Sequence, residues 1–236
     1  MPTNDGLIKI SGPDAKKLLQ GQLTCNVDDV TPTTTCLGAH CNPQGRVISL
    51  FRLFQYEDAY YLYMPTTLVP IALAALKKYA MFYKVELSDA SSELETIQTA
   101  IQLEPYADIQ KGIPAIYPET SGKFLPHDIN LPNLHAINFD KGCYTGQEII
   151  ARIHYRGTPK NHLYLAEITS STAPTPGEDI YSDDQHIAGT VVDVSHCETT
   201  HQTLIVTSAT HAKDNHLFLK SATDAFFIIK NNETRN

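Results

Sequence analysis

The sequence has no uninterrupted apolar run close to the roughly 20 residues that a membrane-spanning helix needs. Residues 1–6 show neither the basic start and apolar run of a signal peptide nor the arginine-rich amphipathic character of a transit peptide. Apolar residues make up 42% of the chain and charged residues 19%, which is ordinary for a soluble globular protein. We therefore expect a cytoplasmic protein with no membrane segment.

The sequence also lacks a disulfide framework and the spacings typical of metal sites. It has 5 cysteines, an odd number scattered along the chain, which favours reduced thiols (Cys25, Cys36, Cys41, Cys143 and Cys197). A plant-type iron–sulfur run of Cys-x4-Cys-x2-Cys fails because Gln44 stands at the third position. No His-x3-His or Cys-x2-Cys spacing is present, so we expect no metal site and interpret the five histidines after Leu163 as surface residues.

An excess of positive charge is missing as well, because 26 acidic residues outnumber 18 basic ones and the net charge is −8. This balance argues against direct nucleic-acid binding, in which neutralisation of phosphates dominates the affinity. The charge is uneven, however, since residues 140–160 hold four basic side chains and two acidic ones. An anionic ligand could meet this region, although a solvated helix face would have the same composition.

The 236 residues favour two domains over one. Ser11 to Asp14 predict the start of a helix, and residues 67–80 predict a core helix whose apolar residues are Leu68, Ile71, Leu73, Ala75 and Leu76. Residues 46–64 predict a β-hairpin, and residues 83–87 and 96–103 predict two strands, which together indicate an α+β layer. After residue 157, short strands are expected in a small barrel or sandwich, at residues 163–168, 179–181, 187–194, 204–208 and 226–229.

Chemistry is concentrated in the stretch Lys141-Gly142-Cys143-Tyr144-Thr145-Gly146-Gln147-Glu148. Thr145 and Glu148 have the spacing of a capping box, which predicts a helix beginning near Gly146. Cys143 then precedes a helix N-terminus and lies close to Lys141, and both features favour a thiolate. The alternative is that Cys143 is a small buried hydrophobic residue, which is the more common role of a single cysteine.

This stretch, followed by His154-Tyr155-Arg156-Gly157, resembles the signature of the YgfZ-type folate-binding proteins. These are relatives of the glycine-cleavage T-protein that support iron–sulfur cluster assembly and tRNA modification. Further blocks resemble the family in the same order, at residues 11–15, 19–24, 42–47, 112–114, 124–126 and 130–131. The resemblance implies an α+β, T-protein-like fold with a C-terminal antiparallel β-barrel.

The resemblance also implies a division into domains and a function. Residues 1–157 would form the folate-binding region, in which residues 46–111 are inserted between residues 1–45 and 112–157, and residues 158–236 would form the barrel. The expected function is an auxiliary factor for iron–sulfur assembly and tRNA modification rather than a classical enzyme. Its cofactor would be tetrahydrofolate, its partners would be iron–sulfur client or assembly proteins, and it would act as a monomer.

The resemblance implies roles for residues of the signature stretch and its surroundings. Cys143 would be the reactive thiol and Lys141 would lower its pKa. The folate-binding residues would be Tyr144, whose ring could stack on the pteridine, and Gln147, Glu148, Arg152, Arg156 and Asn42.

Two departures from the family patterns bear on the choice between functions. Ser49 stands where T-proteins have a carboxylate for aminomethyl transfer, and an alcohol cannot supply that negative charge. Asp108 stands where many family members have an arginine before Gly-Ile-Pro. The alternatives to the auxiliary factor are a folate-dependent one-carbon transferase, which Ser49 argues against, and a non-enzymatic scaffold.

Overall fold

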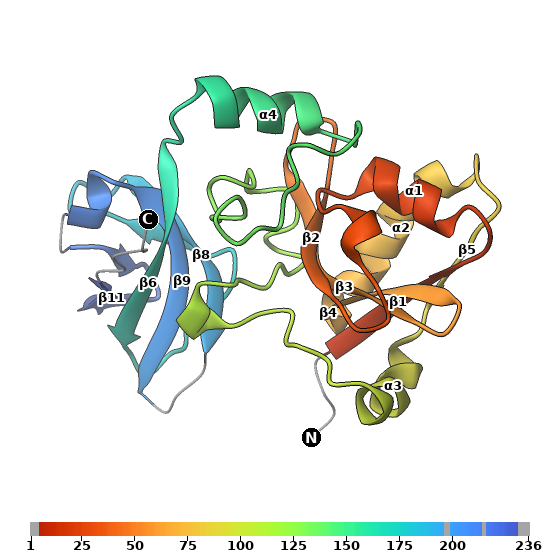
Figure 1. Cartoon of the computed structure of the whole chain (residues 1–236). Helices are drawn as coiled ribbons and strands as arrows, with labels where there is room; N and C mark the ends of the chain where they lie inside the picture. The colour runs from red at the N-terminus through yellow and green to blue at the C-terminus, as the bar shows by residue number, and fades with distance from the viewer. Residues whose placement is uncertain (1–4, 196–198, 214–215, 231–236) are drawn as a thin grey trace. The chain divides into compact units, whose positions relative to one another are not determined.

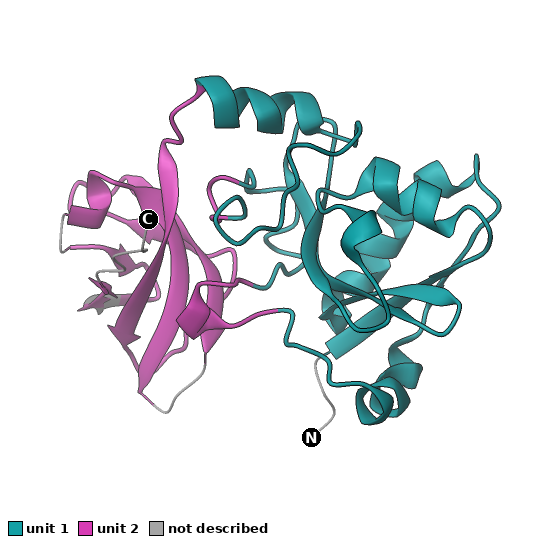
Figure 2. Ribbon diagram, in the orientation of Figure 1, with its two compact units in different colours: residues 1–106, 115–126, 131–156 teal, residues 107–114, 127–130, 157–236 magenta. Residues whose placement is uncertain are grey.

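The structure is a computed structural model that describes residues 5–195, 199–213 and 216–230. The chain divides into two compact units, shown in Figure 2. Unit 1 comprises residues 1–106, 115–126 and 131–156, and unit 2 comprises residues 107–114, 127–130 and 157–236. Cys197 and His196 lie outside the described residues.

Unit 1 is built on an antiparallel sheet of 5 strands in the order β2-β3-β4-β1-β5 (Figure 1). The strands are β1 (Asp5–Ser11), β2 (Cys36–Cys41), β3 (Val47–Tyr56), β4 (Ala59–Pro65) and β5 (Glu86–Asp89). The predicted hairpin corresponds to β3 and β4, which pair from Arg52↔Tyr63 to Tyr56↔Ala59. Strand β1 pairs with both β4 and β5, so the sheet joins residues 1–45 and 46–111, which the sequence analysis assigned to separate domains.

The helices of unit 1 are α1 (Ala15–Gln22), α2 (Val69–Ala80), α3 (Leu94–Ala100) and α4 (Gln147–Arg156). Short 3-10 turns lie at Val27–Asp29, Thr66–Leu68 and Ser91–Glu93. Alternation along β1 directs Gly6 and Leu7 to opposite faces of the sheet. Helix α2 packs over Gly6, where a Cβ would lie 2.7 Å from Val69, whereas α3 packs on the face that includes Leu7.

The structure differs from the predictions for two helices. Residues 96–103 were expected to form a strand, but α3 occupies most of this range. Leu94 and Ile97, three residues apart on one face of α3, are 3% and 1% exposed in a cluster with Phe54, so burial outweighs the β-propensity of the threonines. Ile71 was among the apolar residues of the predicted core helix, but it is 37% exposed, whereas Ala72, which was not among them, is buried.

Unit 2 is a nearly closed antiparallel barrel of 7 strands in the order β11-β10-β7-β8-β9-β6-β12. They are β6 (Asn161–Thr169), β7 (Asp179–Tyr181), β8 (Ile187–Ser195), β9 (Thr200–Ser208), β10 (Phe218–Leu219), β11 (Ala222–Phe226) and β12 (Ile228–Ile229). The unit also holds 3-10 turns at Ile109–Lys111 and His211–Lys213. The prediction that the late histidines lie on the surface is wrong for His201, which is 3% exposed and contacts the Ser170 carbonyl through Nε2 at 3.1 Å.

Within the described ranges, no helix is long and apolar enough to cross a membrane. The same residues contain no group of three or more histidine, cysteine or acidic side chains arranged to hold a metal ion.

Candidate functional site

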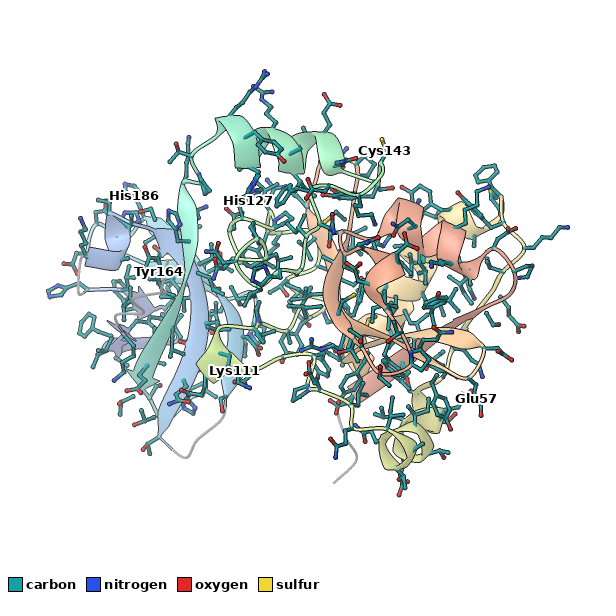
Figure 3. All side chains as sticks on the ribbon, in the orientation of Figure 1. Glu57, Lys111, His127, Cys143, Tyr164 and His186 are labelled. Carbon is teal, nitrogen blue, oxygen red and sulfur yellow. The ribbon has the colours of Figure 1, made fainter. Side chains whose placement is uncertain are left out.

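The signature stretch forms a loop that leads into α4, and it presents Cys143 to solvent. The predicted helix start is confirmed, because α4 begins at Gln147. Cys143 is an exposed free cysteine on the loop before the helix N-terminus, and Figure 3 shows its side chain on the outside of this loop. The alternative of a buried, purely structural Cys143 therefore does not apply.

The loop is fixed by residues near the N-terminus rather than by the predicted capping box. Thr145 donates its hydroxyl to Gln22 Oε1 at 3.0 Å and its N–H to the Gly21 carbonyl at 3.2 Å. The capping box was wrong because Thr145 finds these tertiary partners, while Glu148 is exposed. The loop is thus tied to the C-terminal end of α1.

Gly146 lets the start of α4 approach the turn between β2 and β3. Its φ of +85° lies in the left-handed region, and a Cβ at this position would lie 2.6 Å from the Asn42 carbonyl oxygen. The same turn places Gly45 against α4, where a Cβ would lie 3.1 Å from Ile149. Only glycine satisfies both the backbone angle and the short distance at position 146.

Lys141 anchors the loop to a third segment. Its Nζ donates to the carbonyl oxygens of Leu23 at 2.8 Å and Cys25 at 2.7 Å. Burial lowers the pKa of Lys141 to about 8, because desolvation penalises the ammonium. The side chain therefore binds the backbone of residues 23–25, and its predicted role beside Cys143 stays a prediction.

Tyr144 packs inside unit 1. Tyr144 is 6% exposed, and the Lys141 Nζ lies 5.4 Å from the centre of its ring. Burial raises the pKa of the Tyr144 hydroxyl, and the nearby Cys41 raises it further to a smaller extent. With this burial, the ring has little free face for the predicted stacking on a pteridine, and no described residue bonds its hydroxyl.

The other predicted binding residues lie on α4 and on the β2–β3 turn. Arg152 and Arg156 are exposed, and their spacing of four residues puts them on one face of α4. Gln147 is half-buried and Glu148 is exposed in the first turn of the same helix. Asn42 shapes its turn by accepting the Arg46 N–H through Oδ1 at 2.9 Å, so this oxygen has a structural role.

The departure at Ser49 lies in a buried environment. Ser49 is 0% exposed and pairs across β2 and β3 with His40, which is also 0% exposed. Burial, with the charge of Lys78, lowers the pKa of His40 to about 4, so the imidazole is neutral near pH 7. This pair holds no carboxylate of the kind that aminomethyl transfer requires.

Sequence reasoning missed two features of the site. The ring of Phe139 stacks on His154 of α4, with 3.8 Å between ring centres and 14° between planes. Cys25 and Cys36 lie close to each other and to Lys141, although Lys141 is more than 100 positions away from both in the sequence. No local pattern indicates either contact, because the partners come from separate segments of the chain.

Comparison with solved structures defines the class of fold. The chain matches the crystal structure of the glycine cleavage system aminomethyltransferase T from Bartonella henselae with a TM-score of 0.67, over 97% of this chain and 83% of that one. The sequences are 9% identical, so the likeness establishes the fold alone. The protein therefore has a T-protein-like fold.

Sequence comparison then gives the family. The tRNA-modifying proteins YgfZ of Vibrio vulnificus and Klebsiella pneumoniae are 31% and 30% identical, covering 74% of this chain and 71% and 72% of theirs. An uncharacterised protein of Haemophilus influenzae is 32% identical over 74% of this chain and 75% of its own. No family model matches the chain. The chain belongs to the YgfZ family.

Proposed function

We propose that this protein is a folate-binding auxiliary factor that supports iron–sulfur cluster assembly or repair, and through it tRNA modification. The observation that carries the proposal is the exposed Cys143 on a loop anchored at residues 21–25 and at the turn after β2. The relatives named as tRNA-modifying proteins and the T-protein-like fold support it. Its site of action would be the cytoplasm, and its partners would be iron–sulfur client or assembly proteins.

The geometry suits a thiol that meets another molecule. A reactive cysteine must be accessible, and a thiol on a loop that is anchored elsewhere can meet a partner without large rearrangement. Clusters are usually held by four thiolates, so one cysteine cannot hold a cluster alone. Cys143 would therefore act in redox or transfer chemistry, or as one transient contact to a cluster that a partner holds.

Tetrahydrofolate is the proposed cofactor, and α4 supplies charges for its carboxylates. Arginine suits carboxylate binding because its planar guanidinium donates two parallel hydrogen bonds. Arg152 and Arg156 are exposed on one face of α4 and are the proposed contacts, with Gln147 and Glu148 at the start of the helix. The likeness of the fold to the aminomethyltransferase supports this proposal.

Calorimetry of tetrahydrofolate binding to the purified protein under anaerobic conditions tests the folate role. We expect saturable binding that weakens roughly tenfold in Arg152→Ala, the loss of one charge-assisted contact. Lys77→Ala is the matched control, since Lys77 is an exposed cation on α2 in the same unit. Absence of binding to the wild type at millimolar ligand would refute the folate role and favour the scaffold alternative.

Complementation of a deletion strain tests the thiol separately. Cys143→Ala should fold normally and bind tetrahydrofolate, yet fail to restore the activity of iron–sulfur enzymes. Cys41→Ala is a control for loss of a cysteine, because Cys41 is 0% exposed and cannot meet a partner. Full rescue by Cys143→Ala would show that the thiol has no role in the supporting activity.

A further inference from the structure

A second pair of thiols lies behind the Cys143 loop. Residues 23 and 40 form an antiparallel bridge, and the Thr24 N–H donates to the Ala39 carbonyl at 2.9 Å. Continuing this register sets Cys25 opposite Gly38. A Cβ on Gly38 would lie 2.4 Å from the Cys25 Sγ, so the thiol occupies the space that a side chain at position 38 would fill.

Cys36 is the neighbour of Cys25 on the same face of β2. Side chains alternate along a strand, so Cys36 and position 38 point to one side of the sheet. The side chain of Cys36 is close enough to that of Cys25 to raise the pKa of the Cys25 thiol. Because position 38 is glycine, no side chain separates them.

The two cysteines differ in access. Cys25 is 3% exposed, whereas Cys36 is half-buried and can meet a small reagent. Lys141 lies on the other side of Cys25, with its Nζ 2.7 Å from the Cys25 carbonyl oxygen. Cys36 and burial raise the pKa of the Cys25 thiol more than the Lys141 charge lowers it, so the more accessible Cys36 is the thiol placed to react first.

We propose that Cys25 and Cys36 form a redox-active dithiol that exchanges with low-molecular-weight disulfides. Cys36 attacks the disulfide RSSR, forms a mixed disulfide and releases one RSH. Cys25 then attacks the Cys36 sulfur, which forms the internal disulfide and releases the second RSH. The two protein thiols are oxidised, the small disulfide is reduced to two thiols, and the two protons leave on those thiols.

The oxidised pair acts on the loop that carries Cys143. The Thr24 hydroxyl donates to the Ala136 carbonyl at 2.6 Å, and the Asn138 N–H donates to the Thr24 carbonyl at 2.9 Å. With the Lys141 contacts, residues 23–25 are thus bonded to the segment that precedes Cys143. A disulfide between Cys25 and Cys36 would link residues 23–25 covalently to β2. It would thereby restrict the movement of these residues and of the segment bonded to them. The inference is independent of folate binding.

Redox titration followed by peptide mass spectrometry tests the pair. Folded protein carrying Cys143→Ser is equilibrated with glutathione buffers of rising oxidised fraction, quenched with acid and alkylated. Cleavage on the amino side of Asp28 separates Cys25 from Cys36, so the internal disulfide appears as two linked peptides. In this Cys143→Ser protein we expect the linked peptides both with Cys25 and Cys36 unchanged and after the further substitution Cys41→Ser. We expect their complete loss after the further substitution Cys36→Ser.

A second measurement reads the coupling to the loop. Deuterium uptake by residues 136–141 should fall in the oxidised form relative to the reduced form, and should not change with redox state in Cys36→Ser. Glutathione retained on Cys36 at every buffer ratio, without linked peptides, would overturn the dithiol. Formation of the disulfide with unchanged uptake at residues 136–141 would overturn the coupling to the Cys143 loop.

Discussion

Acidification should destabilise the protein through His40. The residue is 0% exposed, neither ring nitrogen has a hydrogen-bond partner among the described residues, and its ring contacts Tyr79 edge-on. Burial, with the nearby Lys78, lowers the pKa from 6.5 to about 4. Because the folded pKa lies below the unfolded one, the unfolded chain takes up the proton first as the pH falls. Stability is therefore lost between about pH 6.5 and pH 4.

The size of the effect follows from the two pKa values. Since one pKa unit corresponds to about 1.36 kcal/mol, full protonation costs about 3 kcal/mol, of which about 2 kcal/mol is lost between pH 7 and pH 5. Urea unfolding followed by circular dichroism at the two pH values measures it. The loss between them should be about 2 kcal/mol smaller in His40→Leu than in the wild type. His135→Asn is the control, because His135 is exposed in the same unit and asparagine tolerates its positive φ. An equal loss in wild type and His40→Leu would refute the reasoning.

Three further predictions concern the loop, the core and the buried lysine. Gly146→Ala should destabilise the protein by about 1–3 kcal/mol, because its φ is +85° and a Cβ would lie 2.6 Å from a backbone oxygen. Gly142→Ala, with nothing within 4 Å of its Cβ, should stay close to wild type in the same urea titration, and equal losses would contradict this account. Leu94→Ala should cost about 2–4 kcal/mol through loss of buried surface and a cavity, whereas the exposed Ile71→Ala should cost less than about 1 kcal/mol by thermal or urea unfolding. The pKa of Lys141 falls from 10.5 to about 8, so the wild type should gain stability relative to Lys141→Met as the pH rises from 8 to 10, and a constant difference would argue against a buried ammonium.

The sequence was most informative where structure is set by near neighbours. The predicted strands of residues 179–181 and 187–194 correspond closely to β7 and β8, because alternating apolar residues bounded by turn residues leave few other options. The start of α4 was also predicted correctly. Residues 96–103 failed for the opposite reason, since threonine and isoleucine favour a strand locally while the buried face of α3 is decided by contact with the sheet.

Prediction from neighbouring residues was less successful at the site, because the local spacing there predicts different hydrogen bonds from those that form. Thr145 and Glu148 have the spacing of a capping box, yet the Thr145 hydroxyl bonds Gln22, which is 123 residues away in sequence. Lys141 is two residues from Cys143, yet its ammonium bonds carbonyl oxygens 118 and 116 residues away. A spacing rule reports which side chains can meet within one helix turn, and it has no information on competing partners from elsewhere in the chain. The conformation of the signature stretch is therefore held by its bonds to residues 21–25, and under the dithiol proposal Cys25 and its neighbour Cys36 are where a change outside the stretch should alter the behaviour of Cys143.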